Sequence, residues 1–240
     1  MRPATQSEIL PGKTLVQSDR TLGLLCRLPA PVHRSGPSGV APDGDPAATR
    51  VYNPRRRKAA AVFQLPILFF TKYTIGWIGS PSTARYLRDI APALAEVCRD
   101  GHARVRLVGS GAIDLPGVPV EVVAWREDSE VEEIRGFDVG VMPLPDEPWA
   151  RGKCGFTLIQ YMACWLPVVA SPVGVNAEIV EEGGNGFLAA DREAWVKALE
   201  ALRVDAALGR RLGAAGRGKV EARYCQAVTG PRVAVLLRAV

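Results

Sequence analysis

Histidine is scarce in this sequence of 240 residues, which contains His33 and His102 and no other. A Ser–His–Asp triad needs a histidine as its base, and many catalytic metal sites use several histidine ligands. Two histidines in the whole chain argue against both arrangements. We therefore expect neither a histidine-based triad nor a histidine-rich metal site.

Paired cysteines are also lacking. The chain has an odd number of cysteines, widely spread and without a Cys-x-x-Cys pair: Cys26, Cys98, Cys154, Cys164 and Cys225. Disulfide frameworks and zinc sites depend on cysteines at regular, close spacing. The pattern predicts free thiols in a reducing compartment, which favours a cytoplasmic protein.

Long apolar runs are missing as well. No stretch reaches the roughly 18 apolar residues of a transmembrane helix, and the N-terminus lacks the apolar core of a signal peptide. The basic pI of 9.1 arises from one region. Residues 1–72 hold 11 Lys and Arg against 4 Asp and Glu, whereas residues 73–240 hold 19 against 21. The predicted folded body is therefore not basic, and we expect no nucleic-acid binding.

Residues 1–72 are predicted to be an irregular basic segment, because nine prolines and five glycines interrupt every candidate element. One apolar stretch, AAAVFQLPILFF at residues 59–70, follows four basic residues at 55–58. This pattern fits a peripheral anchor on the inner face of a membrane. It also fits a single strand or short helix packed on the body, or poorly ordered chain, because Pro66 breaks an amphipathic helix.

From Tyr73 onward, short apolar runs alternate with amphipathic segments, which predicts an α/β, Rossmann-like doubly wound parallel sheet over residues 73–225. The expected strands are Thr74 to Ile78, Val105 to Val108, Val118 to Val123, Phe137 to Leu144, Pro167 to Ser171 and Gly186 to Ala189. The main expected helices are Ala84 to Arg99 (capped by Ser82 or Thr83), Asp128 to Arg135, one from Gly155, one from Asn176, one from Asp191 to Leu202, one from Asp205 to Tyr224, and Val233 to Val240.

The carboxyl ends of parallel strands share one edge of a sheet, which is the usual ligand edge. The first loop at this edge, Gly79 to Thr83, is small and hydroxylated. Backbone N–H groups of such a loop hold phosphate when they open a helix. We therefore take Gly79, Ser80 and Ser82 as candidates, although an ordinary strand-to-helix turn has the same composition.

The second loop, RGKCGFT at Arg151 to Thr157, is the strongest candidate. Two glycines permit close approach of a ligand, and Lys153 beside a helix N-terminus favours a diphosphate. The candidate contacts here are Lys153, Cys154, Gly155, Phe156, Thr157 and, one turn further on, Gln160 through a ribose or sugar hydroxyl. No histidine is near Cys154 in the sequence, so we do not interpret it as a nucleophile.

The third loop, PVGVNAE at Pro172 to Glu178, opens another helix. We expect Gly174, Val175 and Asn176 to present backbone N–H groups to a ligand. Glu178 fits two roles equally well. It either complements the helix dipole or binds a sugar hydroxyl.

Several of these motifs together resemble one family. FDVGVMPL, RGKCGF, LIQYMAC, LPVVASPVGVN and NGFLA resemble the C-terminal, donor-binding half of GT-B fold glycosyltransferases of family 4, and TIGWIGSPST resembles the opening of that half in one branch. The resemblance covers about Thr74 to Tyr224. It implies retaining, metal-independent transfer of a sugar from a nucleotide diphosphate-sugar to a glycan or lipid-linked acceptor, with no cofactor.

The resemblance also assigns roles to the candidate residues. Gly79 to Ser82 and Lys153 to Phe156 would border the diphosphate, Gln160 would lie where relatives hold the ribose with a glutamate, and Gly174 to Asn176 would flank the phosphates or the sugar. It identifies no catalytic side chain in this half.

Two departures from the family pattern look local to this chain. Thr157 replaces a lysine, so one cation fewer is expected near the diphosphate. Trp165 replaces a glycine at a helix C-terminus, so we expect the left-handed residue to be lost and the next strand to be crowded.

Residues 1–72 are too short for the N-terminal, acceptor-binding half of a GT-B enzyme, so the resemblance suggests a truncated chain. The C-terminal helix at 226–240 is then expected to expose an apolar face. Besides a glycosyltransferase, two alternatives stay open: a catalytically silent nucleotide-sugar-binding or partner-binding remnant, and a related epimerase. The epimerase is disfavoured, because the acidic and histidine residues that it requires are not found here.

Overall fold

The computed structural model describes residues 72–238, and the structural statements below concern this range. The predictions made for residues 1–71, including the basic irregular segment and the membrane anchor, lie outside the described residues.

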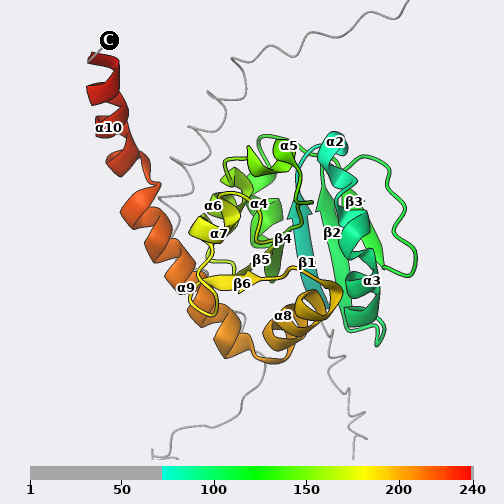
Figure 1. The fold of residues 1–240 in the computed structure, drawn as a ribbon. Helices are drawn as coiled ribbons and strands as arrows, with labels where there is room; N and C mark the ends of the chain where they lie inside the picture. The colour runs from blue at the N-terminus through cyan, green and yellow to red at the C-terminus, as the bar shows by residue number, and fades with distance from the viewer. Residues whose placement is uncertain (1–71, 239–240) are drawn as a thin grey trace, which may run out of the picture. The chain divides into compact units, whose positions relative to one another are not determined.

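The described residues form a six-stranded, all-parallel sheet with the strand order β3-β2-β1-β4-β5-β6 (Figure 1). The strands are β1 (Tyr73–Ile78), β2 (Ala103–Val108), β3 (Val120–Val123), β4 (Val139–Met142), β5 (Val168–Ala170) and β6 (Gly186–Leu188). The first three strands progress toward one edge and the last three toward the other. This topology confirms the predicted doubly wound α/β fold.

A loop without a helix connects β2 to β3, and helices connect the other successive strands. The helices are α2 (Pro81–Ala84), α3 (Leu87–Val97), α4 (Glu130–Arg135), α5 (Pro148–Arg151), α6 (Phe156–Ala163), α7 (Asn176–Ile179) and, after β6, α8 (Arg192–Val204), α9 (Ala206–Arg223) and α10 (Gln226–Arg238). Two predicted N-caps are confirmed. Asp191 accepts a hydrogen bond from the N–H of Ala194, and Asp205 accepts from Ala207 and Leu208.

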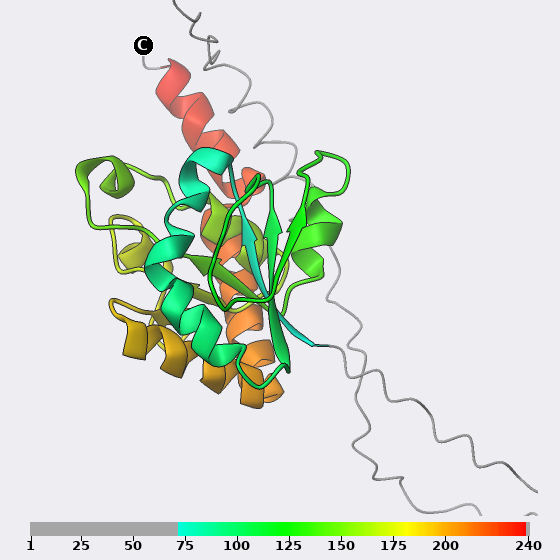
Figure 2. The same cartoon turned by 90° about the vertical axis from the view of Figure 1, so that its right-hand side faces the viewer.

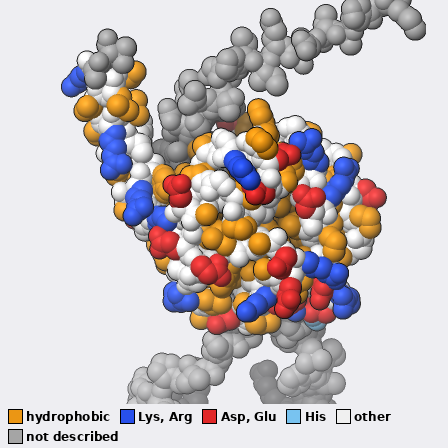
Figure 3. All heavy atoms as spheres, viewed as in Figure 1, with side chains coloured by type: hydrophobic (Ala, Val, Ile, Leu, Met, Phe, Trp, Pro, Cys, Tyr) orange, Lys and Arg blue, Asp and Glu red, His pale blue; other side chains and the backbone are white. Residues whose placement is uncertain are grey.

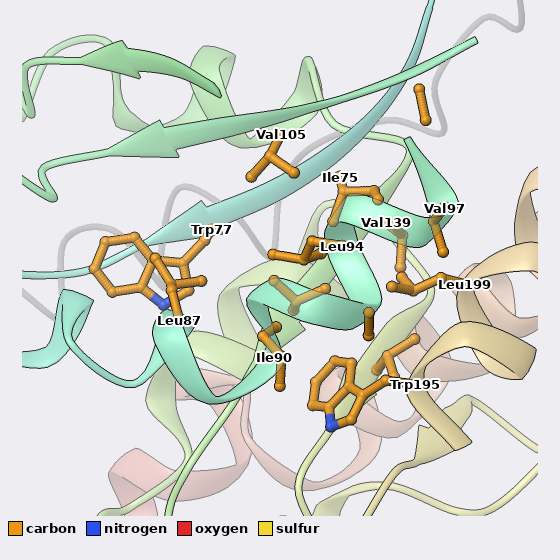
Figure 4. Packing of buried hydrophobic residues seen from close by; sticks show 14 of the residues in the cluster. Ile75, Trp77, Leu87, Ile90, Leu94, Val97, Val105, Val139, Trp195 and Leu199 are labelled. Atoms are coloured by element: carbon orange, nitrogen blue, oxygen red, sulfur yellow. The ribbon is translucent and has the colours of Figure 1, made fainter. Parts of the chain in front are cut away.

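Helices cover both faces of the sheet (Figures 1 and 2). On one face, α3 and α8 pack against strand residues that include Ile75 and Val139 (Figure 4). On the other face, α6 and α9 pack against residues that include Ile78 and Val168. Residues of β1 contribute to the apolar cores on both faces, because successive side chains of a strand point to opposite sides of the sheet. Burial on both faces also explains the nearly continuous apolar sequence of β1.

Three predicted helix boundaries were wrong. Ser80, not Ser82 or Thr83, caps the first helix, and its N–H donates to Thr83 Oγ1 over 3.3 Å. The expected helix from Ala84 to Arg99 is divided into α2 and α3. The last helix begins at Gln226 and continues through Pro231, because the carbonyl of Cys225 accepts from Val228 and Thr229 and thereby starts the helix before the proline.

The expected loss of a left-handed residue at Trp165 was also wrong. Trp165 has a φ of 64° and is the one non-glycine residue with positive φ in the described range. Buried Arg217 holds it there: the guanidinium lies 5.7 Å from the centre of the indole ring and donates to the carbonyl of Ala163 at the end of α6. The following strand, β5, stays regular.

The C-terminal helix α10 has no buried residue, and its apolar side chains Val233, Val235, Leu236 and Leu237 are more than half exposed. Figure 3 shows hydrophobic and basic side chains side by side along this helix. Among residues 72–238, no helix combines the length and apolarity that crossing a membrane requires.

Candidate functional site

The strand order reverses between β1 and β4, and this switch point is where open α/β sheets bind ligands. The two strands pair only at Ile75 with Val139 and at Gly76 with Gly140. Beyond these pairs, the hydroxyl of Tyr161 from α6 takes the hydrogen bond of the Ile78 N–H at 2.9 Å. A side chain therefore replaces the strand pairing at the carboxyl ends of β1 and β4.

Tyr161 fits between the strands because two glycines leave room for aromatic rings. A Cβ atom at Gly140 would lie 2.3 Å from the Tyr161 ring, and one at Gly76 would lie 1.9 Å from Phe137. The two rings meet edge to face with centroids 6.3 Å apart. Burial raises the pKa of the Tyr161 hydroxyl, so it stays protonated and can both accept from Ile78 and donate.

The first predicted loop lies directly after β1. Its Gly79 N–H is already used, because it donates to the carbonyl of Val108 at the end of β2. The Ser80 and Ser82 hydroxyls are 2.8 Å apart, and both residues are exposed. This loop thus offers two hydroxyls to a ligand, whereas the Gly79 N–H is bound within the protein.

The second predicted loop ends at the N-terminus of α6. Gly155 caps this helix in the left-handed region, with φ 67°. First-turn N–H groups have no acceptor within their own helix, and no hydrogen bond among the described residues occupies those of Gly155, Phe156 and Thr157. Lys153 is half-buried beside them, and Cys154 is exposed.

The third predicted loop is packed directly against the second. A Cβ on Gly155 would lie 2.3 Å from Ile179 Cδ1, and a Cβ on Gly174 would lie 2.6 Å from the carbonyl oxygen of Arg151. Ser171, directly after β5, is connected to the chain just after β4, since its Oγ accepts from the Leu144 N–H at 3.0 Å. The structure therefore brings the second and third loops together at the edge of the sheet.

Within the third loop, the candidates have different environments. Asn176 is fully buried; its N–H donates to the Val173 carbonyl at 3.3 Å, and its Nδ2 donates to Ser171 at 3.2 Å. Asn176 thus holds the third loop through hydrogen bonds within the protein, and its N–H is not presented to a ligand. Val175 is half-buried, and Gly174 and Glu178 are exposed.

Gln160 does not face solvent either. The residue is 4% exposed, and its Nε2 donates to Glu130 Oε1 of α4 at 2.8 Å. The second N–H of Nε2 and the amide oxygen are the groups of Gln160 left for a ribose contact. Sequence reasoning missed Glu130 because the partner is 30 residues away and lies on another helix.

The thiols differ in accessibility. Cys98 and Cys164 are buried, and burial raises the pKa of Cys98 to about 11 and of Cys164 to about 12. Cys225 is half-buried. Among the four cysteines in the described range, only Cys154 is exposed, and it lies next to Gly155.

The charged side chains near the three loops are mixed in sign. Arg151 forms two short contacts with Asp146, at 2.6 and 3.0 Å. Arg85, directly after α2, lies 3.8 Å from Glu147, which directly precedes α5. Within the part of the chain that the structure covers, no cluster of three potential metal ligands is found. Figure 3 shows acidic and basic side chains interspersed over the side of the molecule that it draws.

A profile described as "Glycosyl transferases group 1" matches residues 72–205, which is more than half of the chain. The chain belongs to this family. No curated protein matches the sequence significantly.

Solved structures share the fold of this group 1 chain. HepE of Anabaena, in complex with UDP and glucose, aligns with a TM-score of 0.59 and 18% identity over 70% of this chain and 49% of its own. Sucrose-phosphate synthase of Thermosynechococcus elongatus aligns with a TM-score of 0.57 and 22% identity, over 71% of this chain and 46% of its own. TarM of S. aureus aligns with a TM-score of 0.55 and 15% identity, over 68% of this chain and 35% of its own. The chain thus spans less than half the length of each of these three structures.

Proposed function

We propose that residues 73–225 form the donor-binding half of a glycosyltransferase and bind the diphosphate of a nucleotide-sugar at the switch point between β1 and β4. The observation that carries this proposal is the N-terminus of α6. There, Lys153 and three unoccupied backbone N–H groups lie where the second and third loops meet. An anion at such a site is stabilised by the helix dipole and by charge-assisted hydrogen bonds.

The same groups supply what sugar transfer demands of this half. As the bond between the sugar and the diphosphate breaks, negative charge grows on the departing phosphate oxygen. Lys153 and the α6 N–H groups are fixed donors that stabilise this charge without a metal ion. We propose a retaining, metal-independent transfer, in which the acceptor is brought by a second half that is not among the described residues.

Complexes of HepE with UDP and glucose support a uridine nucleotide as the first donor to test. Calorimetry with UDP-sugars and GDP-sugars measures donor binding. Assays for sugar release and sugar transfer then measure the reaction. Absence of binding at millimolar donor would refute the proposal. Binding without turnover would favour the alternative, a nucleotide-sugar-binding protein without activity.

Lys153→Ala is expected to weaken donor binding about tenfold, because it removes one charge-assisted contact worth about 1.5 kcal/mol to the diphosphate. The measurement is the Kd of UDP by calorimetry. Lys197→Ala is the matched control, since Lys197 is an exposed lysine on α8. An equal effect of both variants, or none from Lys153→Ala, would argue against the proposed diphosphate site.

Cys154 offers a second test that leaves the sequence unchanged. Bound UDP is expected to slow alkylation of Cys154 by at least about fivefold, since a ligand at Gly155 covers the neighbouring thiol. Peptide mass spectrometry after timed iodoacetamide treatment measures the rate, with half-buried Cys225 as the internal reference. Unchanged labelling of Cys154 at saturating UDP would place the nucleotide elsewhere.

A further inference from the structure

A polar contact spans the two segments that leave the switch point. The hydroxyl of Tyr86, between α2 and α3, donates to Glu147 Oε1 at 3.1 Å. Arg85 Nη2 lies 3.8 Å from the same oxygen and 3.4 Å from the Tyr86 hydroxyl. Arg85 and Tyr86 lie in the segment that follows β1, and Glu147 lies in the segment that follows β4. Figure 1 shows the helices of these segments, α2 and α5, at the same end of the sheet. Glu147 therefore joins the two sides of the proposed donor site.

Arg85 is held loosely in this contact. Its guanidinium rests on the Tyr86 ring, 5.1 Å from the ring centre, and its side chain is 61% exposed. Glu147 is its one acidic partner among the described residues. Exposed ion pairs of this kind contribute little to stability. An incoming phosphate with two free oxygens offers the guanidinium a better, bidentate partner.

Glu147 is connected to the second loop. It caps α5, and its carbonyl accepts from the Arg151 N–H at 3.0 Å, two residues before Lys153. The neighbouring pair Asp146–Arg151 is closer, at 2.6 Å, and does not involve Arg85. Glu147 therefore belongs to the same short segment as Lys153 and is tied to it through the backbone of α5.

We propose that Glu147 is an internal competitor of the donor: in the free protein its carboxylate neutralises Arg85, and the donor's diphosphate displaces it. This inference rests on the proposed donor site. Release of Glu147 frees Arg85 to bind phosphate and frees the two sides of the site from each other. Tyr86 is the positioning residue, since its ring supports Arg85 and its hydroxyl holds Glu147.

The test is a double-mutant cycle on Arg85 and Glu147, with the Kd of UDP measured by calorimetry. Glu147→Gln keeps an oxygen that accepts from Tyr86 but removes the charge, and it is expected to tighten UDP binding about three- to fivefold. Arg85→Ala is expected to weaken binding about tenfold. In the Arg85→Ala background, Glu147→Gln is expected to change the Kd by less than about twofold, because the two effects are coupled.

Uridine is the matched ligand control, because it lacks the phosphates; its Kd is expected to be the same in the wild-type protein and in Glu147→Gln. If Glu147→Gln tightens UDP binding equally in the wild-type and in the Arg85→Ala background, the proposal is overturned. The gain would then come from removing a negative charge near the site and not from releasing Arg85. UDP binding by the wild-type protein with no response to Glu147→Gln would also overturn it, while leaving the donor site intact. No UDP binding by any variant would refute the donor site itself.

Discussion

Gly213→Ala is expected to lower the free energy of unfolding by about 2–3 kcal/mol, the upper range for overpacking a close contact. Gly213 lies in α9 where this helix crosses the end of α6. A Cβ atom there would lie 2.0 Å from the carbonyl oxygen of Trp165 and 2.8 Å from its carbonyl carbon. These are backbone atoms, so no side chain can rotate away, and α9 would have to move off the sheet.

Gly218→Ala is the matched control, in the same helix five residues later. Gly218 is exposed, and no atom lies within 4 Å of a Cβ built there. Replacing an exposed helical glycine by alanine is expected to raise stability by about 0.5–1 kcal/mol. Urea unfolding of both variants measures the difference. Midpoints that move in the same direction would show that contact with Trp165 does not determine the packing of α9.

The contrast bears on how far the sequence predicts the fold. Helix α9 contains several glycines, and the capping signal of Asp205 was enough to predict its start. Which glycine touches a neighbour depends on the crossing of α9 with α6, and that crossing is absent from any local pattern. Trp165 shows the same limit: its left-handed backbone is supported by Arg217, more than 50 residues further along the chain.

The candidate site was predictable in part for a similar reason. Apolar runs followed by small or capping residues identified all three loops, because this pattern is local. The partners that occupy some of their groups are not local. The Gly79 N–H is taken by Val108, Gln160 by Glu130, and the Asn176 side chain by Ser171. Pattern reasoning predicts the groups that a ligand would use, and the tertiary structure shows which of them already have a partner within the protein.

Tyr161→Phe is expected to cost about 2 kcal/mol of stability, because it leaves the buried Ile78 N–H without an acceptor. The ring stays between the strands, so packing against Gly140 and Phe137 is kept and the loss reports the hydroxyl alone. Tyr224→Phe is the control, since the Tyr224 hydroxyl has no hydrogen bond among the described residues; its expected change is below about 0.5 kcal/mol.

Tyr161 also links stability to the proposed function. Its hydroxyl fixes the last residue of β1, directly before Gly79 and Ser80, and its helix, α6, is capped by Gly155. Loss of the hydroxyl is therefore expected to loosen the first loop relative to the second and to weaken UDP binding about three- to tenfold in the folded variant. Calorimetry at a temperature where Tyr161→Phe is fully folded measures this effect. A stability loss with unchanged UDP affinity would show that Tyr161 supports the sheet but does not set the spacing of the two loops.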